Sequence, residues 1–230
     1  MDFFSKIVEL FSNQSYIESL FSGLLITIEI AFFAVIIGFV LGLIIALIRV
    51  AKPSKWLTIP KIICRVYVTI IRGTPMALQL FIMFFIIFAI RDFPEIVTAI
   101  IAFGLNSAAY SSEIFRSGIL SVDKGQKEAG LSLGLSEGVV FRHIILPQAL
   151  KNVIPSLGSE IITVIKETAI VSMVGMYDLN MAAKDIGSGK NMASYIVPMF
   201  IVSLFYLAIV YIITLIVGII EKRLRKSDNN

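Results

Sequence analysis

The chain is a series of long apolar stretches separated by short polar ones. A helix of about 20 apolar residues is long enough to cross the hydrocarbon core of a bilayer, and five stretches reach that length. We expect spanning helices at about residues 20–48, 56–90, 93–119, 148–176 and 194–220. The pattern predicts an all-α membrane protein with about five transmembrane helices, organised as a single transmembrane domain over residues 1–230.

Two of these stretches carry signals that interrupt a straight helix. The second is too long for one span at about 1.5 Å per residue, and it contains Arg72-Gly73-Thr74-Pro75. Because the residue before a proline avoids helical geometry, we expect a break near Gly73 and Pro75. In the fourth stretch Pro155 predicts a kink.

Composition narrows the class of protein. Hydrophobic residues make up 57% of the chain and charged residues 16%, against about a quarter charged in ordinary globular domains. These values argue strongly against a soluble enzyme. The single Cys64 cannot form an internal disulfide, and with the single His143 it offers no ligand cluster. We therefore expect no metal site and no resident cofactor in this chain.

The basic residues gather in the segments after the first, third and fifth stretches, which indicates how the chain is oriented. These residues are Arg49, Lys52, Lys55 and Lys61, then Lys124, Lys127, Arg142 and Lys151, then Lys222, Arg223, Arg225 and Lys226. Because cytoplasmic loops are enriched in lysine and arginine, five spans place the N-terminus outside and the C-terminus in the cytoplasm. Positions beside spans also indicate contact with membrane lipid rather than with nucleic acid.

The cytoplasmic segment at about residues 120–147 has the signals of two short helices. Asp123 can cap the first, with Gln126 completing a capping box, and Gly134 can end it in a left-handed conformation. Ser136 can cap the second, and Pro147 can end it and begin the fourth span. The pattern leaves two interpretations open: a docking surface for a partner, or an amphipathic hairpin on the lipid surface.

The spacing within this segment resembles the EAA loop of type I ABC-importer permeases. The matching residues are Glu128, Ala129, Gly130, Gly134, Ile144, Leu146 and Pro147. The resemblance implies that they couple the chain to a separate ATPase. Gly130 stands where the family usually has a second alanine, an exchange that we expect to cost helix stability but to change the shape little.

Further stretches resemble the polar amino-acid uptake permeases, whose members include histidine, arginine, glutamine and cystine permeases. They are Arg72-Gly73-Thr74-Pro75, Gln79-Leu80, Asn106-Ser107-Ala108-Ala109-Tyr110, Glu113-Ile114-Phe115-Arg116 and Lys166-Glu167-Thr168. The resemblance implies a permease subunit in a prokaryotic cell membrane that moves substrate by alternating access. It also implies three kinds of partner: an ATP-binding subunit that holds ATP and magnesium, an extracytoplasmic amino-acid-binding protein, and a second permease that is a copy or a paralogue. This chain has no phosphate-binding loop of its own and is not expected to be an enzyme.

Ionisable residues inside spans are costly and usually face a cavity or a partner. The acidic faces of the third and fourth spans, which carry Glu113 and Glu160, could meet and bind an amino acid. Their acidity favours a cationic substrate such as arginine, lysine or histidine, with glutamine and cystine open. The full set of candidate substrate ligands is Glu113, Glu160, Asn106, Thr74, Gln79 and Thr168.

Structural pairing is the alternative for these charges. Glu113 could pair with Lys166, and Arg72 could be an interfacial residue or a clamp on backbone carbonyls. The rival functions are a secondary amino-acid transporter without an ATPase, a membrane enzyme and a non-transporting scaffold. The repeated halves and coupling-ion site of many secondary transporters and the catalytic constellation of an enzyme are not visible in the sequence.

Overall fold

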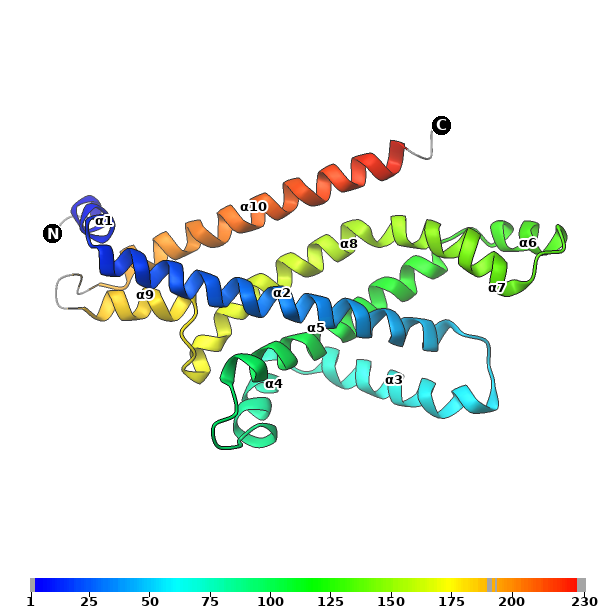
Figure 1. Ribbon diagram of the computed structural model, residues 1–230, viewed down its shortest axis with the longest axis horizontal. Helices are drawn as coiled ribbons and strands as arrows, with labels where there is room; N and C mark the ends of the chain where they lie inside the picture. Colours follow the sequence, from blue (N-terminus) through cyan, green and yellow to red (C-terminus); the bar gives the residue numbers. More distant parts are fainter. Residues whose placement is uncertain (1–2, 190–191, 193, 227–230) are drawn as a thin grey trace. The chain divides into compact units, whose positions relative to one another are not determined.

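The computed structural model describes residues 3–189, 192 and 194–226, and throughout these residues the regular structure is helical (Figure 1). The elements are α1 (Phe3–Ser12), α2 (Gln14–Val50), α3 (Lys55–Gly73), α4 (Met76–Ile82), the π-helix η1 (Met83–Ile87), α5 (Glu95–Leu120), α6 (Lys124–Ser132), α7 (Glu137–Val140), the π-helix η2 (Phe141–Ile145), α8 (Leu146–Glu167), the 3-10 helix η3 (Thr168–Val174), α9 (Leu179–Ser188) and α10 (Ile196–Lys226). The expected all-α fold class is confirmed.

Each of the five predicted spans corresponds to helix. Within the described residues, α2 and α10 are each long and apolar enough to cross a membrane by length and composition, and α3 with α4 and η1 qualifies as a broken pair. The 26 residues of α5 and 22 of α8 correspond to about 39 Å and 33 Å of helix, enough for a core of about 30 Å. These two helices are more polar than α2 and α10, because they carry most of the buried polar side chains of the described residues.

The second span is broken where the sequence predicts it. Thr74 is extended, with φ −123° and ψ 145°, as expected for a residue before proline. Pro75 is also extended, and its carbonyl accepts the N–H groups of Leu78 and Gln79, which starts α4. In the fourth span the α-helix continues through Pro155, ends at Glu167 and tightens into the 3-10 helix η3. The kink expected at Pro155 stays a prediction.

The chain folds into two compact units. The first consists of Met1–Ile36, Pro75–Gly104 and Ile162–Ile212, and the second of Ile37–Thr74, Leu105–Ile161 and Ile213–Asn230. Four helices, α2, α5, α8 and α10, contribute residues to both. The core of the first unit gathers buried apolar residues of α1, α2, α9 and α10, such as Leu10, Leu20, Leu179 and Ile201.

The core of the second unit depends on a close approach of α2 and α5. A Cβ added to Gly38 would lie 2.5 Å from Ser107 Oγ, and one added to Gly42 would lie 2.7 Å from Ser111 Cβ. Two glycines four residues apart are typical of helices that pack closely inside membranes. Next to them Ala46, Phe115 and Val153 are buried together, which joins α8 to the same pair.

Candidate functional site

The polar segment between α5 and α8 forms the two short helices that the sequence predicts. Asp123 caps α6, since its Oδ1 accepts the N–H of Gly125 at 2.6 Å. Gln126 Oε1 accepts a hydrogen bond from Gln148 Nε2 at 3.3 Å, and among the described residues no bond from Gln126 to the N–H of Asp123 completes the expected capping box. Ser136 stands at the N-cap of α7 but makes no capping bond with its side chain.

Gly134 ends α6 in the left-handed conformation, with φ +79°. The N–H of Leu135 donates to the carbonyl of Gly130 at 3.2 Å, and the N–H of Gly134 donates to Leu131 at 3.0 Å. This pair of bonds is a Schellman motif, which satisfies the last carbonyls of a helix and reverses the chain. The turn from α6 into α7 is therefore well defined.

Gly130 lies at the contact between α6 and the helix that follows. A Cβ there would lie 2.8 Å from Val140 Cγ2 and 3.1 Å from Ile144 Cδ1. Position 130 is therefore tightly packed in this chain, and the expectation that glycine in place of alanine changes the shape little stays a prediction. The missing methyl group allows α6 to approach α7 and η2 this closely.

The second short helix does not end at Pro147. Helical structure runs without interruption from α7 through η2 into α8, and Leu146 keeps helical φ and ψ of −61° and −43°. Leu146 donates its N–H to Phe141 across the π-turn, and Pro147 then takes the second position of α8. The prediction that Pro147 separates the second short helix from the fourth span is wrong, and α7 is a direct extension of α8.

The motif residues of this segment divide into exposed and packed ones. Four of them are exposed: Glu128, Ala129, Gly134 and Pro147. Two are half-buried, Ile144 and Leu146, and Gly130 is buried. Large apolar side chains are exposed beside them, with Leu133 at 81%. The α6–α7 pair (Lys124–Ser132 and Glu137–Val140) thus presents exposed charged and apolar side chains, while Gly130 packs against the helix that follows.

A pocket of about 260 Å³ lies in the second unit, within the spans, and we call it the charged pocket. It is lined by Arg72, Tyr110, Glu113, Ile114, Ser117 and Glu160. The expectation that the acidic residues of the third and fourth spans lie close together holds for Glu113 and Glu160.

Glu113 is held by two arginines. Its Oε1 accepts from Arg49 Nη1 at 2.5 Å and its Oε2 from Arg116 Nε at 2.8 Å. The expected partner was Lys166, so the alternative of structural pairing is supported with different residues. Arg49 stands in the last turn of α2. An arginine at the end of an apolar span is the sequence signal that could have identified it as a partner for Glu113.

Glu160 is in a different environment. It is 8% exposed and accepts a hydrogen bond of 2.8 Å from the neutral hydroxyl of Ser107. Asn106, the candidate next to Ser107 on α5, is buried.

Arg72 lies against an aromatic ring in the charged pocket. Its guanidinium carbon is 5.3 Å from the centre of the Tyr110 ring, a cation–π distance, and both residues line the pocket. Sequence reasoning noted both residues but assigned a substrate role to neither.

The remaining candidates lie elsewhere. Thr74 follows α3 in the second unit and donates its hydroxyl to Ile70 at 2.9 Å. Gln79 and Thr168 belong to the first unit. Thr168 is buried, with its hydroxyl bonded to Ile165 at 2.6 Å. Among the described residues there is no group of His, Cys, Asp and Glu that could hold a metal ion.

Residues 38–226 match the family described as binding-protein-dependent transport system inner membrane component. The chain is 38% identical over 216 residues to the arginine transport system permease protein ArtQ of Bacillus subtilis (strain 168), across 92% of this chain and 95% of that protein. It is also 38% identical over 218 residues to the L-cystine transport system permease protein TcyB of the same organism, across 92% and 89%.

Two solved structures are similar to this chain over most of its length. One described as the crystal structure of an amino acid ABC transporter with histidines superposes with a TM-score of 0.84 at 35% identity, covering 97% of this chain and 99% of that chain. An inward-facing structure of the MetNI methionine ABC transporter gives a TM-score of 0.73 at 21% identity, across 92% and 99%, and is similar in fold.

Proposed function

This chain belongs to the family of binding-protein-dependent transport system inner membrane components, and from that premise we propose that it is the permease subunit of an ATP-driven importer of polar amino acids. The relatives it resembles over most of its length are named as permeases for arginine, cystine and, in Rickettsia felis, putatively glutamine. Family membership favours this function over a secondary transporter that works without an ATPase.

The α6–α7 pair is the proposed docking surface for the ATP-binding subunit. It projects exposed charged and apolar side chains, including Glu128 and Leu133. The Schellman turn at Gly134 and the packing of Gly130 on Val140 make the pair a stiff body. A stiff body can be moved as a unit when a partner closes, as in hinge or shear transitions.

The continuity of α7 with α8 offers a route from this surface to the substrate. A displacement of α7 is transmitted to α8 without an intervening loop, and α8 carries Glu160 into the charged pocket. Hydrolysis of ATP, with its magnesium ion, takes place on the partner. The role of this chain is to change the shape of the charged pocket.

The observation that carries the substrate class is the pairing of opposite charges in one small pocket. Arg72 supplies a guanidinium suited to an α-carboxylate, and Glu160 supplies a carboxylate suited to an ammonium group. Glu113 lines the pocket too, but its charge is balanced by Arg49 and Arg116. Arg72 and Glu160 together match the head group that all amino acids share, and the volume of about 260 Å³ lies just below the usual range of about 300–1,000 Å³ for ligand sites.

We further propose that the second unit faces the cytoplasm, with the N-terminus outside. That unit contains fifteen of the 20 lysine and arginine residues, all except Lys6, Arg91, Lys166, Lys184 and Lys190. Such an excess is typical of the cytoplasmic side. The partners in this arrangement are an ATP-binding subunit, a second permease and, on the other face, an amino-acid-binding protein.

Uptake by the full complex in vesicles tests the proposal. Glu160→Gln and Arg72→Gln are each expected to reduce uptake of arginine and glutamine by at least about tenfold, the effect of losing about 1.4 kcal/mol of binding. Ser117→Ala, at another lining residue, is the control and is expected to leave uptake close to wild type. Unchanged uptake in both charge variants would refute the pocket assignment, and ATP-independent uptake would refute the importer.

Competition between arginine and glutamine in the same assay tests the expected preference for a cationic side chain. If Glu160 binds only the α-ammonium group, its replacement will lower uptake of both amino acids by a similar factor. If it binds the side chain, uptake of arginine will fall more.

A further inference from the structure

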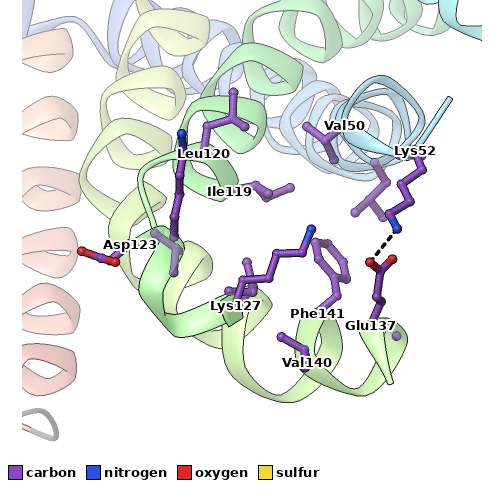
Figure 2. Close-up of a pocket in the computed structure, with 15 residues that line it drawn as sticks. Val50, Lys52, Ile119, Leu120, Asp123, Lys127, Glu137, Val140 and Phe141 are labelled. Atoms are coloured by element: carbon purple, nitrogen blue, oxygen red, sulfur yellow. Dashed lines mark hydrogen bonds and ion pairs between the residues drawn. The ribbon is translucent and has the colours of Figure 1, made fainter. Parts of the chain in front are cut away.

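A second and larger pocket lies in the second unit, between the ends of α2 and α5 and the α6–α7 pair. Its volume is about 580 Å³, and we call it the lysine pocket. Figure 2 shows side chains from all these elements gathered around it. Most of the lining is apolar: Leu47, Val50, Ile119, Leu120, Val122, Val140, Phe141 and Ile145.

Three lysines line the same pocket. Lys52 follows α2, while Lys124 and Lys127 stand in α6. In Figure 2 the Lys127 side chain is directed in among the other lining residues, close to Phe141, while the carboxylate of Asp123 is directed away from them. The positive groups thus lie beside an apolar surface.

The acidic residues at the pocket only partly balance these lysines. Glu137 pairs with Lys52 at 2.5 Å, and this hydrogen bond, with a smaller effect of Lys127, lowers the pKa of Glu137 below its ordinary value. Oδ1 of Asp123 is bonded to the N–H of Gly125. Three lysines against these two carboxylates leave the lining with a net charge of +1, and Lys124 and Lys127 are the lysines outside the Lys52–Glu137 ion pair.

We propose that the lysine pocket binds an anionic phospholipid of the cytoplasmic leaflet, with its phosphate at Lys124 and Lys127 and one acyl chain against Val50, Ile119 and Phe141. The inference rests on the proposed orientation, in which the second unit faces the cytoplasm. Charge complementarity and position support it, because basic clusters at the cytoplasmic ends of spans attract anionic lipids. A volume of about 580 Å³ can hold a phosphate group and part of a chain.

Such a lipid has a consequence for coupling. It contacts the ends of α2 and α5 on one side and α6, α7 and η2 on the other. Its presence supports the α6–α7 pair from behind, opposite the outer surface that we assign to the ATPase. Stimulation of ATP hydrolysis by substrate is therefore expected to depend on anionic lipid.

Two kinds of variant test the site. K124Q/K127Q changes the net charge of the lining from +1 to −1. Gly138→Leu fills the pocket, because a Cβ at Gly138 meets nothing within 4 Å and the residue lines the cavity. K55Q is the matched control, since Lys55 is exposed at the start of α3, outside the lining.

The full complex is reconstituted in vesicles of phosphatidylcholine alone or mixed with phosphatidylglycerol, and retained lipid is measured by native mass spectrometry after extraction. Wild type and K55Q are expected to retain phosphatidylglycerol. K124Q/K127Q is expected to retain about 25-fold less, since each basic residue near an anionic surface contributes about fivefold. Gly138→Leu is expected to lose the retained lipid although its charge is unchanged.

Equal retention by wild type and both pocket variants would overturn the proposal. So would a photo-crosslinking residue in place of Leu120 that labels the ATPase and not lipid. Uptake by wild type in vesicles of phosphatidylcholine alone separates this proposal from the importer function. If the complex takes up substrate in these vesicles and retains no phosphatidylglycerol from the mixed vesicles, only the lipid site is refuted.

Discussion

Nη1 of Arg49 lies 2.5 Å from Oε1 of Glu113, so the last turn of α2 is ion-paired with α5. Both side chains are largely buried, at 16% and 19% exposure. Removing one partner of such a pair leaves a charge without compensation in a medium of low dielectric constant. The pair therefore fixes the register of two helices whose glycine contacts bring them close.

Arg49→Gln is expected to lower the free energy of unfolding by about 2–4 kcal/mol, measured by thermal unfolding in detergent. Arg116→Gln is expected to cost less, because Arg116 is more exposed. The double variant R49Q/E113Q should be less destabilised than the sum of the single variants by at least about 1 kcal/mol. Additive effects would show that the two groups do not interact.

Gly130→Ala is expected to destabilise the α6–α7 pair, because overpacking costs about 1–3 kcal/mol. The better helix propensity of alanine offsets up to about 1 kcal/mol of this cost. The added methyl group would meet Val140 Cγ2 at 2.8 Å. Val140→Ala in the same chain should relieve the contact and restore substrate-stimulated ATP hydrolysis. Gly138→Ala is the control, since it adds a methyl group where nothing lies within 4 Å. If the double variant is no better than Gly130→Ala alone, the contact is not the cause.

Gly134→Ala is expected to destabilise the turn after α6 by about 1–2 kcal/mol, because an L-residue is strained at φ +79°. Gly134→Asn should cost less, since asparagine tolerates this conformation. Hydrogen exchange reports the change directly: the amide of Leu135, bonded to Gly130, should exchange faster in the alanine variant. Equal exchange in wild type and both variants would contradict the role of the turn.

The burial of Asp178 predicts that the stability of the protein depends on pH. Asp178 lies between η3 and α9, outside the spans, and is buried with no hydrogen-bond partner for Oδ2 among the described residues, while Oδ1 accepts the N–H of Met181. Burial raises the pKa of Asp178 from 3.8 to about 6. The folded protein thus binds this proton more tightly than the unfolded chain, and the free energy of unfolding falls as pH rises from about 4 to about 6.

Asp178→Asn should remove this dependence and keep the cap on Met181. At pH 7.5 the variant is expected to be more stable than wild type by on the order of 1–3 kcal/mol, with no difference below the ordinary pKa of the group. Asp185→Asn, at an exposed position on the same helix α9, is the control for the loss of one negative charge. A constant difference at every pH would contradict the assignment.

The positions of the helices followed from the sequence because each depends on local chemistry. Apolar stretches long enough for a bilayer, a break before Pro75, a cap at Asp123 and a left-handed stop at Gly134 are all encoded within a few residues. The continuity of α7 with α8 was missed, since Pro147 is as compatible with the second position of a continuing helix as with a boundary.

What the sequence determined by itself is therefore the class of molecule, the spans and the short polar helices, because hydrophobic length and turn chemistry act between near neighbours. Only the tertiary structure decided which charges meet. Arg49 reaches Glu113 across 64 positions, and Ser107 reaches Glu160 across 53. Such pairs depend on how the helices pack and on their rotation about their axes. That rotation is set by close contacts, such as those of Gly38 and Gly42, that no local pattern specifies.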